Sequence, residues 1–136
     1  MLEPEMEGEP APFETGMSIV RGCLVVPIPT DLDDEAVPAI RKEILNRVES
    51  TGAKGMVIDL SAVRVLDSFT FEALVHTAKM ASLLGAKTVL SGIQPGVASS
   101  LVYLGVDMDT VHTTATLRDA LQQALTQMGH TVSRGK

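Results

Sequence analysis

The hydrophobic pattern of this chain alternates between strand-like and helix-like stretches. Two short β-branched runs, at 18–20 and 23–29, flank the dipeptide Arg21-Gly22. We expect them to form a β-hairpin that turns at this dipeptide. Three later stretches are also strand-like: Met-Val-Ile-Asp-Leu at 56–60, the run 86–92, and the brief run 110–113.

Two long segments between these strands have apolar residues at helical spacing. Asp33 and Asp34 suit the N-terminus of the first helix, with Pro38 limiting how far upstream it is regular. Its expected apolar face is Val37, Ile40, Ile44 and Val48. The second helix is predicted to begin at Ser68 and to stop at Gly85. Its expected buried side is Phe71, Leu74, Val75, Ala78 and Ala81.

Two further helices complete the pattern. One is short, covers 96–104 and is closed by Gly105. The other covers 117–128, is capped by Thr116 and has Asp119 three residues after the cap. The resulting order is ββαβαβαβα. Strand–helix–strand units favour parallel pairing with right-handed crossovers, so we predict an α/β fold with one mixed, mostly parallel sheet covered by helices.

The two ends differ from this body. Residues 1–16 contain five Glu, three Pro, two Gly and no Lys or Arg, which is too little apolar surface to offset the entropy of ordering. We expect a disordered acidic arm over 1–16, one folded domain over 17–128, and a flexible tail over 129–136.

Composition excludes several classes of function. The formal net charge is −6 and the basic residues are scattered, which argues against nucleic acid or an anionic membrane as a partner. Cys23 is the only cysteine, so neither an internal disulfide nor a cysteine zinc cluster is expected. The chain has neither a basic signal-peptide start nor a membrane-length apolar run, so we predict a cytoplasmic protein.

Catalytic and cofactor patterns are also missing from the sequence. Neither G-x-x-x-x-G-K-[ST] nor G-x-G-x-x-G occurs. Ser68 lacks the glycines of a nucleophile elbow, and His76 follows eight residues later, about 12 Å along a helix axis. His76, His112 and His130 have no metal-ligand spacing. We expect no enzyme activity and no cofactor.

Two polar positions have more than one interpretation from the residues alone. Asp59 ends a buried-type strand, where a carboxylate either serves a function or caps the turn at Ser61. Ser68 follows Asp67 at the start of a helix, where it serves as the N-cap or as a hydroxyl that another protein modifies.

The segment GMVIDLSAVRVLDSFTFEAL, residues 55–74, resembles the phosphorylation segment of STAS domains, the anti-sigma-factor-antagonist fold. Their shared pattern is an apolar strand ending in Asp-Leu, a short loop, an apolar pair, and Asp-Ser at a helix start. The segment LLGAKTVLSGIQPGVASSLVYLGV is similar to the STAS proteins of the bacterial stressosome. Within that family the chain looks most like the RsbS type, a single-domain scaffold with Ser at the modified position.

This resemblance implies a non-catalytic scaffold and phosphorylation switch. Unphosphorylated, the protein would sequester an RsbT-type serine kinase within a large assembly that includes an RsbR-type STAS protein. Phosphorylation of Ser68 would release the kinase, and an RsbX-type phosphatase would reset the switch. Asp67, Ser68, Asp59 and Phe69 are the residues expected to contact the partner. A homodimer and a large hetero-oligomer are expected.

Three alternatives stay open at this point. The first alternative is that the chain is a free anti-sigma-factor antagonist that binds an anti-sigma kinase directly. The second is that it is a small hydrolase, which the lack of a base near Ser68 disfavours. Finally, Ser100 is either a secondary phosphorylation site, by analogy with the second modified Thr of RsbR-type relatives, or a small residue packed within its helix.

Overall fold

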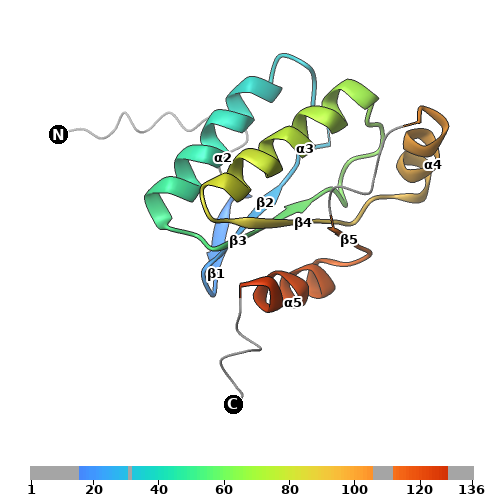
Figure 1. Cartoon of the computed structure of the whole chain (residues 1–136). Coiled ribbons are helices and arrows are strands. Elements are labelled where there is room, and N and C mark those ends of the chain that lie inside the picture. Colours follow the sequence, from blue (N-terminus) through green and yellow to red (C-terminus); the bar gives the residue numbers. More distant parts are fainter. Residues whose placement is uncertain (1–15, 31, 106–111, 129–136) are drawn as a thin grey trace.

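Residues 16–30, 32–105 and 112–128 are described by the computed structural model, and they form a five-stranded sheet with helices on both faces (Figure 1). The strands are β1 (Ser18–Val20), β2 (Cys23–Pro27), β3 (Gly55–Asp59), β4 (Lys87–Ser91) and β5 (His112–Thr114). Their order across the sheet equals their order along the chain. β1 is antiparallel to β2, and the other neighbouring pairs are parallel.

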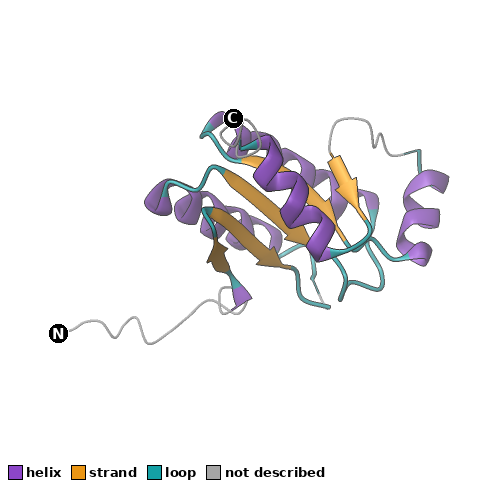
Figure 2. Ribbon diagram, turned by 90° about the horizontal axis from the view of Figure 1, so that it is seen from below, coloured by secondary structure: helices purple, strands orange, loops and turns teal. Residues whose placement is uncertain are grey.

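Helices cover both faces of this sheet. They are α2 (Val37–Thr51), α3 (Ser68–Leu83), α4 (Pro95–Tyr103) and α5 (Leu117–Gln127). α2 and α3 lie side by side on one face and α5 covers the other, while α4 lies beyond the carboxyl ends of the parallel strands (Figures 1 and 2). The predicted mostly parallel α/β fold and its element order are therefore confirmed. The predicted arm and tail, 1–16 and 129–136, lie outside the described residues except for Gly16.

The β1–β2 hairpin turns where the sequence predicts. Arg21 and Gly22 have φ angles of 53° and 84°, so both central residues are in the left-handed region. Two such residues in succession give a turn whose twist matches that of the flanking strands. The glycine adopts this conformation without steric cost, whereas the arginine does not.

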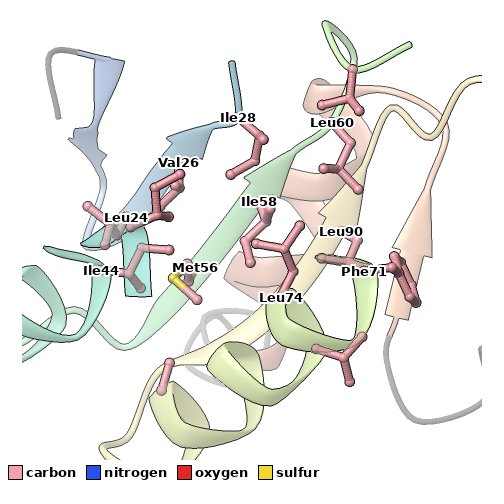
Figure 3. Close-up of a cluster of buried hydrophobic side chains, with 14 of the residues drawn as sticks. Leu24, Val26, Ile28, Ile44, Met56, Ile58, Leu60, Phe71, Leu74 and Leu90 are labelled. Atoms are coloured by element: carbon pink, nitrogen blue, oxygen red, sulfur yellow. The ribbon is translucent and has the colours of Figure 1, made fainter. Parts of the chain in front are cut away.

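The larger hydrophobic core lies between the sheet and the layer formed by α2 and α3 (Figure 3). Alternate residues of β2 and β3 face it, such as Met56 and Ile58 of β3, together with Leu90 of β4. All the residues predicted for the apolar faces of α2 and α3 are buried, and Phe71 is completely buried. Val97 and Leu101 of α4 close the end of this core.

A smaller core lies on the opposite face of the sheet, under α5. Cys23, Val57 and Val89 contribute from three strands, and Ala120 and Ala124 from the helix. Burial raises the pKa of the Cys23 thiol to about 11, so the thiol is protonated at neutral pH. A protonated, fully buried thiol is a packing residue rather than a nucleophile.

One predicted helix start is wrong. α2 begins at Val37, not at Asp33 or Asp34. An N-cap at Asp34 would place Pro38 where its missing N–H is needed for the first hydrogen bond back to residue 34, so the proline fits only within the first turn of a later helix. Asp33 instead holds the turn before α2, because its carboxylate accepts the Ala36 N–H at 2.9 Å.

Two loops meet closely at the carboxyl end of the sheet. Gly92, just after β4, has φ = 75°, and a Cβ there would lie 2.9 Å from the backbone nitrogen of Ser61. Gln94, the residue before α4, donates its side-chain N–H to the carbonyl of Ser61. The missing side chain at residue 92 therefore lets the loop after β4 pack against the loop that leads from β3 to α3.

Replacing Gly92 with alanine is expected to destabilise the domain by on the order of 2–4 kcal/mol, because the change combines an unfavourable φ with a steric overlap. Gly96→Ala is the matched control, since nothing lies within 4 Å of a Cβ at that position of α4. This control should be neutral or stabilising by up to about 1 kcal/mol. Urea unfolding followed by circular dichroism measures both, and equal midpoints for the two variants would contradict this account.

Candidate functional site

The N-terminus of α3 lies at the carboxyl end of the sheet, where the loop 60–67 leads from β3 into the helix. Leu60, Val63 and Leu66 are buried and anchor this loop in the larger core. The residues between them, including Arg64 and Val65, are exposed. The chain therefore reaches the start of α3 on a fixed path, with its polar residues presented to solvent.

Asp67 is the N-cap of α3. Its backbone is extended, with φ = −82° and ψ = 169°, and its Oδ1 accepts the Thr70 N–H at 2.7 Å. The interpretation of Ser68 as the N-cap is therefore wrong, whereas the prediction that the helix begins at Ser68 is confirmed. Asp and Ser are comparable N-caps, and an N-cap side chain accepts the backbone N–H of the residue two or three positions later. Here the N–H that needs an acceptor is that of Thr70, and the side chain three positions before it is that of Asp67.

This correction changes the state of the Ser68 hydroxyl. Ser68 is half-buried, and no hydrogen bond from its hydroxyl to another described residue is found. Thr70, two residues later, is 3% exposed and donates its hydroxyl to Asp34 Oδ1 at 3.2 Å. Of these two hydroxyls in the first turn of α3, the one of Ser68 is accessible and has no structural role.

Carboxylates surround the start of α3 on one side. Asp33, Asp34, Glu35 and Asp67 line a shallow depression of about 500 Å³ together with Leu32. None of its lining residues is basic. The Thr70–Asp34 hydrogen bond ties the loop before α2 to α3, which keeps these four carboxylates together. We call this set the acidic rim.

Phe69 lies on the other side of Ser68 and is 60% exposed. Other large apolar side chains of the described residues are also exposed, among them Leu83 and Tyr103, so what distinguishes Phe69 is its position directly after Ser68. Asp67 and Phe69 are exposed, and Ser68 between them is half-buried. That these three residues contact a partner stays a prediction.

The structure does not bring Asp59 to this segment. Its neighbour Ile58 faces the α2–α3 side, so alternation along β3 directs the Asp59 side chain to the α5 side of the sheet. The Asp59 carboxylate accepts the Ser61 N–H at 3.0 Å, which is the turn-capping role that the sequence left open. This hydrogen bond gives Asp59 a structural role whether or not a partner also contacts it.

The other singled-out residues are dispersed. Ser100 is exposed on α4, so the expectation that it packs within its helix is wrong. His76 lies on α3, eight residues from Ser68, and His112 lies on β5. Among the described residues, no group of three or more His, Cys, Asp or Glu side chains is arranged to hold a metal ion. No helix of the described chain has the length and apolarity to cross a membrane.

Sequence reasoning missed the acidic rim. The sequence did contain a signal for it, because the run Asp33–Glu35, which follows β2, consists of acidic residues. β2 and β3 are parallel neighbours, and the loops at the carboxyl ends of adjacent parallel strands lie close together. The acidic run was interpreted only as the start of a helix, so its proximity to Asp67 was not considered.

The family of the chain follows from its residues 16–120, which match the model of the STAS domain. The chain belongs to the STAS domain family. The five-stranded sheet and the four helices of the described residues are those of a single STAS domain.

Three relatives of this STAS domain are informative. It is 33% identical to RsbRA, an RsbT co-antagonist protein of Bacillus subtilis (strain 168), over 79% of this chain and 39% of RsbRA. It is 32% identical to a Ser-to-Glu variant of Moorella thermoacetica RsbS, with a TM-score of 0.72 over 84% of this chain and 97% of that one. A chain from the stressosome, a signal integration and transduction hub, is 33% identical, with a TM-score of 0.71 over 87% and 98% of the two chains.

These relatives differ in length. The chain spans about two fifths of the length of RsbRA but nearly the whole of the RsbS and stressosome chains. Its STAS domain is thus similar both to solved chains of nearly its own length and to part of a longer co-antagonist.

The capping geometry predicts different effects for two neighbouring substitutions. Asp67→Ala removes the acceptor of the Thr70 N–H and should cost about 1 kcal/mol of folding stability. Ser68→Ala removes a hydroxyl without a structural partner, so its effect should stay within about 0.5 kcal/mol. Urea unfolding midpoints compare the two proteins. A larger loss for Ser68→Ala than for Asp67→Ala would mean that Ser68 carries the cap.

Proposed function

We propose that this protein is a non-catalytic scaffold and switch that holds a serine kinase of the RsbT type and releases it when Ser68 is phosphorylated. The observation that carries this proposal is the accessible Ser68 hydroxyl, which lies one residue after the cap of α3 and has no structural role. The same position is the modified serine in the STAS pattern that the sequence resembles. RsbRA, a relative at 33% identity, is named as an RsbT co-antagonist, which supports the choice of kinase.

The site is suited to acceptance of one phosphate. Ser68 lies in the first turn of α3, where the positive end of the helix dipole favours added negative charge. Thr70 offers a second hydroxyl only two residues away, but it is buried and hydrogen-bonded to Asp34. A kinase that docks at the start of α3 would therefore transfer phosphate to Ser68 alone within this turn.

Release of the kinase follows from the surrounding charges. A phosphate brings about −1.5 to −2 charge at neutral pH. The acidic rim beside it contains four carboxylates and no Lys or Arg that would neutralise this charge. The partner would then have to desolvate or oppose the phosphate in the same interface, and an unpaired interfacial charge costs several kcal/mol. A loss of even about 2.7 kcal/mol weakens a complex a hundredfold.

The proposal includes the other components of such a switch. An RsbR-type STAS protein would share the assembly, and an RsbX-type phosphatase would remove the phosphate from Ser68. Ser68 is half-buried and its hydroxyl makes no hydrogen bond to the described residues, which suits both reactions because kinase and phosphatase each need access to the same oxygen. Ser100, exposed on α4, is the secondary candidate for modification.

Incubation with the cognate kinase and Mg-ATP should add one phosphate, on Ser68. Ser68→Ala should bind the kinase but fail to release it. Ser68→Asp should weaken binding only in part, because a carboxylate carries one negative charge and phosphate nearly two. Peptide mass spectrometry locates the phosphate and a pull-down measures binding. A phosphate on another residue, or unchanged affinity after complete modification of Ser68, would show that the switch is not at Ser68.

A second test separates a stressosome scaffold from a free anti-sigma-factor antagonist. Mixed with an RsbR-type protein, this chain should elute from size-exclusion chromatography as a co-complex of megadalton scale. A free antagonist would elute as a small species with or without that protein. Ser68→Ala is the control, because loss of a hydroxyl with no structural partner should leave assembly unchanged. Small species in both samples would support the antagonist.

A further inference from the structure

A groove between α2 and α3 begins directly beside Ser68. It has a volume of about 280 Å³, and its α3 wall consists of Phe69, Glu72, Ala73 and His76. These residues have the spacing i, i+3, i+4 and i+7, so they form one stripe along the helix. Val37, Pro38 and Arg41 of α2 form the opposite wall, and Asp34 closes the end near the acidic rim.

The groove is lined by both apolar and charged residues. Phe69, Val37, Pro38 and Ala73 provide apolar surface, the carboxylates of Asp34 and Glu72 belong to the same lining, and its other members are Arg41 and His76. Phe69 provides much of the exposed apolar surface of the groove, because 60% of this residue is exposed to water. A partner that covered this ring would remove a large apolar area from water.

The groove is preformed because Arg41 links its two walls. The Arg41 guanidinium donates to the Thr77 hydroxyl at 3.1 Å and to the carbonyl of Ala73 at 3.3 Å. Both acceptors belong to α3, so these hydrogen bonds tie α2 to α3. The two helices lie side by side (Figure 1). A groove that exists before binding does not have to be opened by the partner, which lowers the cost of association.

We propose that this groove is the docking site that gives the serine kinase its affinity for the domain, separately from Ser68. This inference rests on the proposed switch and names the surface through which it works. The occupant is the kinase, because Phe69 follows Ser68 directly and a protein that reaches the Ser68 hydroxyl must also cover this ring. The kinase would insert an apolar side chain beside Phe69 and place a basic residue near Glu72 and Asp34.

The groove and the Ser68 site would thus have different roles in the switch. The groove supplies affinity for the kinase, and the charge at Ser68 lowers that affinity enough for release. In many protein interfaces a buried aromatic residue supplies most of the affinity, and charges at the periphery adjust it. Phosphorylation alters the periphery and leaves the apolar groove intact.

The test measures the affinity of the unphosphorylated full-length chain for the kinase, with a non-hydrolysable ATP analogue. Phe69→Ala should raise the Kd by about tenfold or more, as expected for loss of a central aromatic contact. Leu83→Ala is the matched control, because Leu83 is 89% exposed at the opposite end of α3 and should leave the Kd unchanged.

A charge reversal in the groove gives a second, independent measurement. Glu72→Lys should also raise the Kd, since it would repel the basic residue expected on the kinase. Glu49→Lys, on the exposed C-terminal part of α2, carries the same change of charge away from the groove and should have no effect. Both substitutions are on the surface, so they test the docking site even if Phe69→Ala folds poorly.

Kinetics of phosphorylation distinguish docking from chemistry. Glu72→Lys should raise the KM for this chain as a substrate and leave kcat at saturation unchanged, because Glu72 lies one turn away from the reacting hydroxyl. If Phe69→Ala and Glu72→Lys bind the kinase like the unaltered chain while Ser68 is still phosphorylated and still controls release, the docking site is wrong and the switch stands. If both substitutions weaken kinase binding but Ser68 does not control release, the docking site stands and the switch at Ser68 is wrong.

A different occupant would also be detected. If the groove joins two copies of this chain, Phe69→Ala would reduce the concentration-dependent dimer in analytical ultracentrifugation and leave the Kd for the kinase unchanged. That pair of results would overturn the kinase docking site. Loss of kinase affinity with an unchanged oligomeric state is the result that the proposal expects.

Discussion

The hydrogen bond from the Thr70 N–H to the Asp67 carboxylate fixes where α3 begins, and the arrangement of the exposed surface depends on it. Because Asp67 takes the capping role, the neighbouring serine is left without a structural partner. The same turn directs Phe69 toward α2 and buries Thr70, whose hydroxyl holds Asp34 beside the helix start. One capping interaction therefore orders an accessible hydroxyl, an exposed aromatic ring and a group of carboxylates within a few residues of each other.

The sequence was sufficient for the architecture but not for the identity of the cap. Apolar periodicity is a property of many residues, so a strand such as 56–60 or the buried side of α3 was predicted correctly. The choice between Asp67 and Ser68 as cap depends on the position of a single N–H, which periodicity does not specify. The start of α2 was missed for a similar reason. Asp33 and Asp34 are typical residues of a helix N-terminus, but Pro38 excludes a helix that begins there. The acidic rim and the groove each combine residues from α2 or the loop before it with residues of α3, so they required knowledge of which elements are adjacent.

A site for a reversible charge has requirements that conflict with those of a stable fold. A residue that takes part in the fold cannot gain two negative charges without loss of stability, and a residue far from any ordered surface cannot report its state to a partner. Ser68 meets both conditions, because it is held by the helix backbone while its hydroxyl makes no hydrogen bond to the described chain. In the proposed switch, no Lys or Arg of the acidic rim would neutralise the phosphate, so part of the new charge would act on the protein that covers the site.

The strands lie across the sheet in the order in which they occur along the chain. During synthesis, each strand that leaves the ribosome finds its pairing neighbour already made, and no strand must wait for a distant one. Of the described helices, α5 comes last along the chain, and it covers the face that contains Val57 and Val89. A nascent chain would therefore have one complete core and one bare apolar face until α5 has been made. In this topology the risk of aggregation is greatest in the interval before α5 is made and is confined to a single face of the sheet.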